Sequence, residues 1–279
     1  MNTIISALAY ACPLILCSIG ALFTEYAGCL ALFLDGLVSF SAFLFYTFTV
    51  LTGSPVAGAL LACLGAAVMT LGFSAVVERG GNGRGIGGSG GTNRFIAAIA
   101  MNLLFGALTS CLSWAFFGTR GVLAADFFRF QAGTARAVAI LVTTGFVAIA
   151  IIFLRYSRPG LYIRITGSDA DVLKAKGVNP AHIRTLSWTL ASLYGSAAGC
   201  ILAARLSSFV PNISSGRGWM ALAAVFLGKK KPLRIVAAVL IFCLADIFSA
   251  NIQNYITGIP SSLLISLPYL VSLLLILLK

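Results

Sequence analysis

The chain has 279 residues, of which 59% are hydrophobic and only 9% are charged, against about 25% charged residues in a soluble domain. The net charge is +12 and the mean hydropathy is +1.01. This composition excludes an ordinary soluble enzyme, a disordered chain and a secreted disulfide scaffold. It favours a helical protein that crosses a membrane several times.

Unbroken apolar runs of about 18–24 residues predict the membrane spans, because about 20 helical residues cross the hydrocarbon core. Such runs exclude a β-barrel, whose strands alternate apolar and polar residues. The expected spans are Ile4–Phe23, Gly28–Leu51, Pro55–Val77, Phe95–Phe117, Ala137–Leu154, Leu186–Leu206, Leu233–Ala250 and Ile259–Leu278. A further run, Trp219–Gly228, is too short to cross alone and predicts a short or re-entrant helix. We therefore expect an all-α fold, a single transmembrane domain over residues 1–279 with about eight or nine membrane helices.

The basic residues predict the orientation, since cytoplasmic loops of membrane proteins are rich in Lys and Arg. Fourteen of the 19 basic residues lie in three loops and at the chain end, namely Arg79–Arg94, Arg155–Arg184, Lys229–Arg234 and Lys279. We expect these segments, including the C-terminus, to be cytoplasmic, and Gly118–Arg136 and Ser207–Gly218 to face outward. Basic residues confined to short loops also argue against binding of nucleic acid. The side of the N-terminus stays open.

The sequence lacks the patterns that catalysis or metal binding would need. His182 is the single histidine, and the seven cysteines lie in apolar runs without paired metal-ligand spacing. We therefore expect the cysteines to be buried apolar residues. We also expect the protein to have no metal site, no cofactor and no catalytic residue. A glycine-rich run at 80–91 contains Gly-x-Gly-x-x-Gly, but spans flank it on both sides, which favours a flexible linker. A phosphate-binding loop is also missing, so a partner must supply any ATP hydrolysis.

Two acids lie within the spans, where an ionisable side chain usually has a function. Asp246 is near a span end and is expected to be a structural residue that either reaches the membrane surface or pairs with a neighbouring side chain. Asp35 lies nearer the middle of its run, and both a functional and a structural role stay open for it. Gly195 and Gly199 form a Gly-x-x-x-Gly pattern, which permits close helix packing either within the chain or against a second subunit.

The polar loop between Arg155 and Arg184 contains signals for a short helix over Asp169–Lys176. Ser168 with Asp171 three residues later is close to a capping box, which predicts Ser168 as the N-cap. Asp169 and Asp171 at the start, and Lys174 and Lys176 at the end, suit the helix dipole.

The end of this short helix is also marked. Gly177 predicts a left-handed stop, Asn179 predicts a second N-cap, and Pro180 predicts the first residue of the next helix. A connector that only spans a distance would not need two capped turns in succession.

Several stretches of the chain together form a familiar pattern. They are Ile165–Gly167, Lys176–Pro180, Leu190–Ala204, Ser208–Asn212, Ser215–Trp219, Ala221–Gly228 and, more weakly, Pro13–Leu14, Glu25–Gly28 and Ala98–Leu108 with Asn102. These stretches resemble the permease subunits of bacterial ATP-binding-cassette (ABC) importers. They resemble the subfamily for branched-chain amino acids and simple sugars, and most closely its nucleoside and simple-sugar branch. The chain departs from an Asn-Leu-Gly-x-Glu-Gly pattern of that family at 31–36, where it reads Ala-Leu-Phe-Leu-Asp-Gly.

The resemblance implies a permease without catalytic activity, which forms the pathway for a small polar solute such as a nucleoside, a simple sugar or a flavin. It implies an ABC ATPase, a second permease, an extracytoplasmic substrate-binding protein or lipoprotein, and membrane lipid as partners, in a bacterial inner membrane. Asp35 and Asn102 are its candidate pathway residues. The loop at about 155–184 would contact the ATPase through Ser168, Asp169, Ala170, Asp171, Lys174, Gly177, Asn179 and Pro180.

Two other functions stay open beside this one. A secondary transporter driven by an ion gradient would use acids within the membrane and an internal repeat of spans. A membrane-embedded enzyme would need a nucleophile and base, or a metal site, which the sequence does not present.

Overall fold

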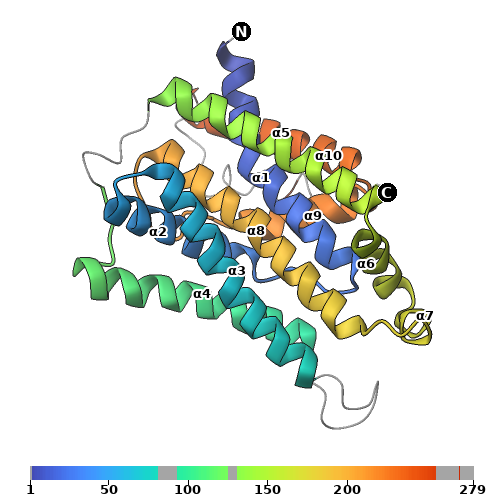
Figure 1. The fold of residues 1–279 in the computed structure, drawn as a ribbon. Helices are drawn as coiled ribbons and strands as arrows, with labels where there is room; N and C mark the ends of the chain where they lie inside the picture. Colours follow the sequence, from blue (N-terminus) through green and yellow to red (C-terminus); the bar gives the residue numbers. More distant parts are fainter. Residues whose placement is uncertain (1, 81–92, 125–130, 256–269, 271–279) are drawn as a thin grey trace.

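The computed structural model describes residues 2–80, 93–124, 131–255 and 270. Within these residues the chain folds into helices joined by short turns (Figure 1). The helices are α1 (Asn2–Tyr26), α2 (Leu34–Thr52), α3 (Pro55–Gly80), α4 (Arg94–Phe117), α5 (Ala132–Tyr156), α6 (Arg158–Ser168), α7 (Ala170–Ala175), α8 (Pro180–Leu206), α9 (Arg217–Leu227) and α10 (Pro232–Tyr255). The glycine-rich run after α3 and the expected last span, Ile259–Leu278, lie outside the described residues except for residue 270.

Seven of the described helices are long and apolar enough to cross a membrane, and α9 is a shorter apolar helix. The long helices are α1, α2, α3, α4, α5, α8 and α10, and they correspond in order to the first seven expected spans. The short helix α9 lies where the run Trp219–Gly228 predicts it. The expectation of a polytopic helical membrane bundle is therefore confirmed.

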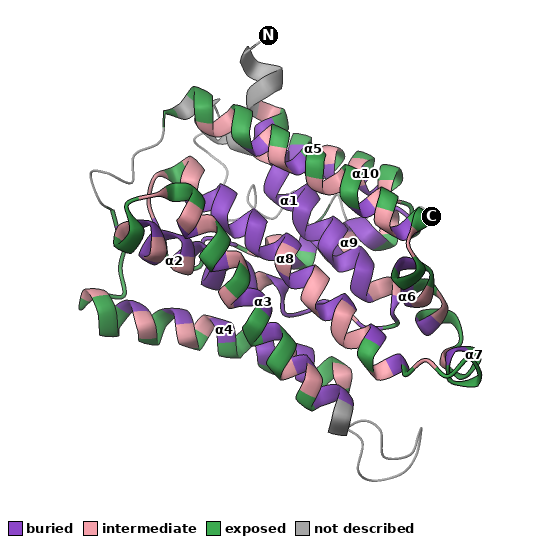
Figure 2. Cartoon of the chain, in the orientation of Figure 1, coloured by how far each residue is buried: buried purple, intermediate pink, exposed green. Residues whose placement is uncertain are grey.

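The core of the bundle is built around α1 and α8. In the apolar window of α1 83% of residues are buried, against 22% in that of α5. Figure 2 shows the same contrast, with α1 and α9 mostly purple and green stripes along α3, α4 and α5. The exposed residues of the outer helices are largely apolar, for example Leu103 and Leu141. In a membrane protein such stripes face lipid or another membrane subunit.

The glycine pair of α8 packs against α2 of the same chain. A Cβ added at Gly199 would collide with the Val38 carbonyl oxygen and the Ser41 hydroxyl, and one added at Gly195 would lie 2.9 Å from Leu34 and Leu37. Close approach of two helices at small residues strengthens van der Waals packing between them. Of the two alternatives left open by the sequence, the structure supports packing within the chain.

The second span starts later than the sequence predicts. The run Gly28–Leu51 is helical only from Leu34, because the backbone turns after Tyr26. Gly28 has φ of +76°, a conformation that ends a right-handed helix, and the Cys29 N–H returns to the Thr24 carbonyl. Cys29 and residues 31–33 are apolar and buried, so hydropathy alone extended the predicted span across this turn.

The burial of the cysteines agrees only in part with expectation. Cys12, Cys17, Cys29, Cys200 and Cys243 are buried, whereas Cys63 is half-buried and Cys111 is exposed. Cys111 lies on the outer face of α4, so its apolar surroundings in the sequence reflect the membrane rather than the protein core.

The ends of the helices separate into two groups. The ends of α1, α3 and α5, the starts of α4, α8 and α10, and all of α6 and α7 lie at one end of the bundle (Figure 1). At the other end, the Arg205 guanidinium near the end of α8 donates to the Ala9 carbonyl near the start of α1 (3.0 Å). The start of α1 therefore lies at the end of the bundle opposite α7.

Candidate functional site

The coupling segment is the name used here for α6, α7 and the start of α8. Its short helix α7 is capped by Asp169, whose carboxylate accepts a hydrogen bond from the Asp171 N–H (2.9 Å). The prediction that Ser168 is this N-cap is wrong. Ser168 is the last residue of α6, and its hydroxyl donates to the Arg164 carbonyl one turn earlier (3.3 Å). The sequence signals did not reveal that a helix, α6, already occupies residues 158–168.

The C-terminal end of α7 has the predicted geometry. Gly177 has φ of +74°, the Gly177 N–H donates to the Lys174 carbonyl, and the Val178 N–H donates to the Leu173 carbonyl, a Schellman arrangement. Asn179 then caps α8 by accepting from the Ala181 N–H (2.9 Å), and Pro180 is the first residue of α8. A fixed turn therefore joins α7 directly to the buried helix α8.

The surface of α7 is charged and solvated on one side and anchored on the other. Asp171 and Lys174 are exposed and form an ion pair of 2.9 Å. The Lys174 ammonium lowers the pKa of the Asp171 carboxyl through this hydrogen bond and its charge. Leu173 is fully buried and fixes the helix, while Val172 is 43% exposed and Ala170 half-buried. Such a face can contact a partner protein.

The coupling segment is attached to the core through the end of α1. Gly167 lies so close to the Tyr26 carbonyl that no Cβ would fit, and the Arg164 guanidinium lies 5.7 Å from the centre of the Tyr26 ring. Beside them, Glu25 forms an ion pair with Lys230 after α9 (3.0 Å). The segment is thus held against the end of α1, and that end is itself tied to the loop after α9.

A polar pocket lies between α2, α4 and the segment that precedes α9. Its volume is about 420 Å³. Both predicted pathway residues, Asp35 and Asn102, line it. The other lining residues are Gly36, Ser39, Leu103, Gly106, Ala107, Thr109, Ser110, Ser113, Arg120, Phe209, Pro211 and Asn212.

Asp35 has a structural task at this pocket. One carboxylate oxygen, Oδ1, accepts from the Ser214 hydroxyl (2.5 Å) and from the Gly218 N–H (3.1 Å). Gly218 is in the first turn of α9, whose own N-cap is Gly216 and offers no side chain. Asp35 therefore caps α9 from another helix and suits its dipole. The other oxygen, Oδ2, has no hydrogen-bond partner among the described residues.

Asn102 joins α4 to the start of α2. Its side-chain oxygen accepts from the Gly36 N–H (2.6 Å), and a Cβ on Gly36 would collide with the Asn102 backbone carbonyl. Within the described part of the chain its amide NH₂ group has no partner. Asp35 and Asn102 thus each combine a structural hydrogen bond with a polar group at the pocket.

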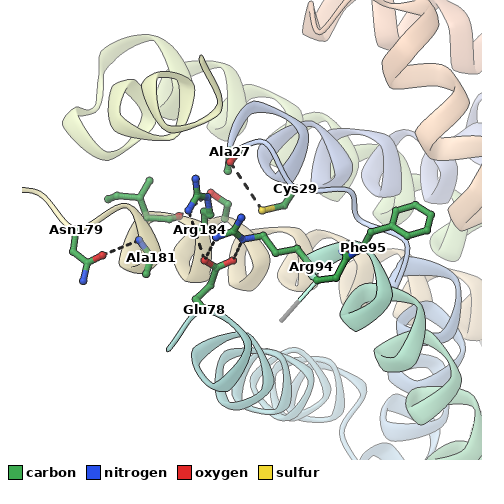
Figure 3. Close-up of polar contacts among 11 residues, drawn as sticks. Ala27, Cys29, Glu78, Arg94, Phe95, Asn179, Ala181 and Arg184 are labelled. Carbon is green, nitrogen blue, oxygen red and sulfur yellow. Dashed lines mark hydrogen bonds and ion pairs between the residues drawn. The ribbon is translucent and has the colours of Figure 1, made fainter. Parts of the chain in front are cut away.

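Glu78 is a residue that the sequence reasoning missed. It lies in the last turn of α3 and is 2% exposed. It holds the guanidinium of Arg94 at the start of α4 through two bonds of 2.7 and 3.1 Å. The Arg184 guanidinium of α8 lies 3.8 Å from the same carboxylate (Figure 3). The sequence presented these residues only as charges near span ends, because the pairing depends on three separate helices.

At the opposite end of the bundle, Asp246 pairs with a neighbour as expected. Its carboxylate accepts from the Tyr10 hydroxyl (2.7 Å), and the Arg205 and Arg217 guanidiniums lie 5.4 and 5.8 Å from the Tyr10 ring centre. This cluster joins α1, α8, α9 and α10 and explains the acid within a span.

Comparison with known proteins gives consistent results. The family described as "Branched-chain amino acid transport system / permease component" matches residues 3–278. The chain is 25% identical to the guanosine ABC transporter permease protein NupQ of Bacillus subtilis, over 96% of this chain and 89% of that protein. It is 37% identical to the ribose import permease protein RbsC of Escherichia coli K12, over 27% of this chain and 23% of that protein.

A solved structure resembles the fold. PsaBC from Streptococcus pneumoniae in complex with Fab aligns with a TM-score of 0.54 and 17% sequence identity, over 98% of this chain and 88% of that chain. At this identity the likeness concerns the arrangement of helices alone.

Proposed function

The chain belongs to the permease-component family of branched-chain amino acid transport systems, and from this premise we propose that its cargo is a nucleoside or a simple sugar. The chain is the membrane-spanning permease subunit of an ABC importer. A protein of this family works with an ATPase and a substrate-binding protein. Its fold contains the membrane helices for a pathway, while hydrolysis of ATP belongs to the separate subunit.

The polar pocket is the observation that carries the substrate proposal. Its volume of about 420 Å³ lies within the range of small-molecule sites, roughly 300–1,000 Å³. Serine hydroxyls, two asparagines, Arg120 and the Oδ2 oxygen of Asp35 offer both donors and acceptors. Such a lining suits a hydroxyl-rich, uncharged solute better than an apolar one.

The position of α4 supports a second permease as partner. This helix lies at the edge of the bundle, packed against α2 and α3, and its far face carries exposed residues (Figure 2). The pocket-lining residues Asn102, Gly106 and Ser110 recur at intervals of four, so they share one side of α4. A second copy or a paralogue placed along α4 would complete the wall of the pathway.

The remaining parts of the proposal concern location and contacts. We place the chain in a bacterial inner membrane, surrounded by lipid, as a single transmembrane domain with α7 and the C-terminus in the cytoplasm. The ATPase would contact the loop at about 155–184, chiefly through α7, its caps Asp169 and Gly177, and the start of α8. The binding protein would deliver its cargo at the opposite end.

Filling the pocket tests the proposal. Gly106 lines the pocket, and a Cβ there meets no atom within 4 Å, so Gly106→Leu should fold and occupy the space. Gly145 on α5 is equally open but outside the pocket, which makes Gly145→Leu the matched control. In cells with the whole importer, we expect Gly106→Leu to abolish uptake of labelled guanosine or ribose while Gly145→Leu retains it. Equal uptake by both variants at equal expression would refute the pocket as pathway.

A further inference from the structure

The Glu78 carboxylate pairs much more closely with Arg94 than with Arg184. Glu78 holds Arg94 with two short bonds, whereas its nearest approach to Arg184 is 3.8 Å. The Nε atom of Arg184 is buried and has no hydrogen-bond partner among the described residues. One buried carboxylate thus faces two guanidiniums and is fully bonded to only one of them.

The underpaired cation is close to the coupling segment. Arg184 lies one turn into α8, just after the cap Asn179 and Pro180, and its side chain is only 16% exposed (Figure 3). A movement of α7 would therefore shift the Arg184 guanidinium through a short, fixed turn.

The fully paired cation belongs to the pocket helix. Arg94 is the first residue of α4, and Asn102 lies two turns further along the same helix. Whatever holds Arg94 therefore also holds the cytoplasmic end of the helix that lines the pocket.

We propose that Glu78 is a positioning residue for transport, whose carboxylate exchanges Arg94 for Arg184 during the transport cycle. In the present arrangement it ties α3 to α4. After α7 moves α8, it ties α3 to α8 instead and releases the start of α4. A buried acid left without a partner is strongly destabilising, so the carboxylate must always hold one of the two cations. The exchange therefore favours two discrete states over a continuum.

The inference rests on the proposed function, and its first test uses the complete importer with its ATPase and binding protein in proteoliposomes. Arg184→Gln leaves the Glu78–Arg94 pair in place but removes the second partner. We expect the number of substrate molecules imported per ATP hydrolysed to fall about tenfold, in the usual range of coupling between sites. Arg234→Gln, an exposed arginine at the same end of the bundle, is the control and should keep the wild-type ratio. A wild-type ratio in Arg184→Gln overturns the proposal.

A double variant that swaps the two charges distinguishes the proposed change of partner from a purely structural role, in which Glu78 only holds α3 against α4. Glu78→Arg combined with Arg94→Glu restores the ion pair between α3 and α4, so thermal stability of the complex should recover relative to Glu78→Arg alone. Transport should stay lost, because Arg184 would then face another cation. Recovery of both stability and transport would show a clamp and overturn the exchange.

The test of Glu78 can be distinguished from the test of the proposed substrate. Each variant is compared with the wild-type complex and whichever substrate that complex imports. Absence of guanosine and ribose uptake by the wild type would contradict the proposed cargo, whereas the ratio of import to hydrolysis decides on Glu78.

Discussion

The backbone at Gly177 requires a conformation that few residues adopt. Its φ is +74°, and a Cβ there would meet no atom within 4 Å, so a substitution is opposed by the backbone alone. Gly177→Val should cost about 1–2 kcal/mol and misdirect α7. We expect normal membrane insertion, lost uptake and weaker copurification with the ATPase.

Gly53 provides a matched control for this change. It has φ of +67° and is equally open, but it ends α2 at the opposite end of the bundle. Gly53→Val should carry similar strain and still copurify with the ATPase. Equal recovery of the ATPase with both variants would contradict a coupling role for the turn at Gly177.

Two substitutions at Asp35 can separate its structural role as the cap of α9 from its polar role at the pocket. Asp35→Ala removes the cap of α9 and should lower stability by about 1 kcal/mol, whereas Asp35→Asn keeps an acceptor for the Gly218 N–H. We expect thermal denaturation in detergent to show a loss only for Asp35→Ala, while uptake falls in both. Full uptake by Asp35→Asn would limit Asp35 to its structural task.

At this scale the sequence predicts contacts that are local along the chain. Asn179 and Pro180 begin α8 and Gly177 ends α7 as expected, because capping involves residues two to five positions apart. Glu78 was missed because its partner Arg184 is on α8, and the hydrogen bonds of Asp35 come from the segment before α9 and from its first turn. No local sequence pattern predicts contacts between residues that lie far apart along the chain.

Among the elements, long apolar runs fixed which segments are spans but not always where they begin. The run from Gly28 reads as one span, yet a buried turn occupies its first residues. The helix α6 was missed because its residues mix arginine, glycine and apolar side chains without a clear period. Tertiary contacts, such as that of Gly167 with Tyr26, hold it in place.

The contact between α8 and α2 gives an element-level prediction. Gly199→Leu would overlap the Val38 carbonyl and the Ser41 hydroxyl, and overpacking of this kind costs about 1–3 kcal/mol. Gly72→Leu on α3, where a Cβ meets nothing within 4 Å, is the control. Thermal unfolding of the purified permease should shift down for Gly199→Leu alone. An unchanged transition for Gly199→Leu would mean that this face of α8 is not packed in the chain.

For the whole molecule, the basic loops predict the sidedness, and the fold adds the place of the start of α1. The sidedness can be tested with single cysteines introduced into a variant that lacks the seven native cysteines. We expect Ser168→Cys to react with an impermeant thiol reagent only in inverted vesicles. We expect Val122→Cys, in the exposed stretch before α5 that should face outward, to react only in intact cells. Labelling of Ser168→Cys from outside intact cells would reverse the orientation.

The central position of α1 and α8 could not be predicted from the sequence. The apolar windows of α1 and α8 have mean hydropathies of 1.9 and 1.3, against 2.0–2.7 for the outer helices α3, α4, α5 and α10. The lower value of α8 does not by itself place it at the centre, because in a membrane apolar residues face lipid as readily as protein. Small residues at contacts, such as Gly195, distinguish the inner helices only once their partners are known.

The most direct test of the account is import into proteoliposomes that contain this permease with or without its ATPase and binding protein. We predict accumulation of nucleoside or sugar only when both partners and ATP are present, and none in response to a proton or sodium gradient. Accumulation driven by an ion gradient with this chain alone would contradict the assignment and identify a secondary transporter instead.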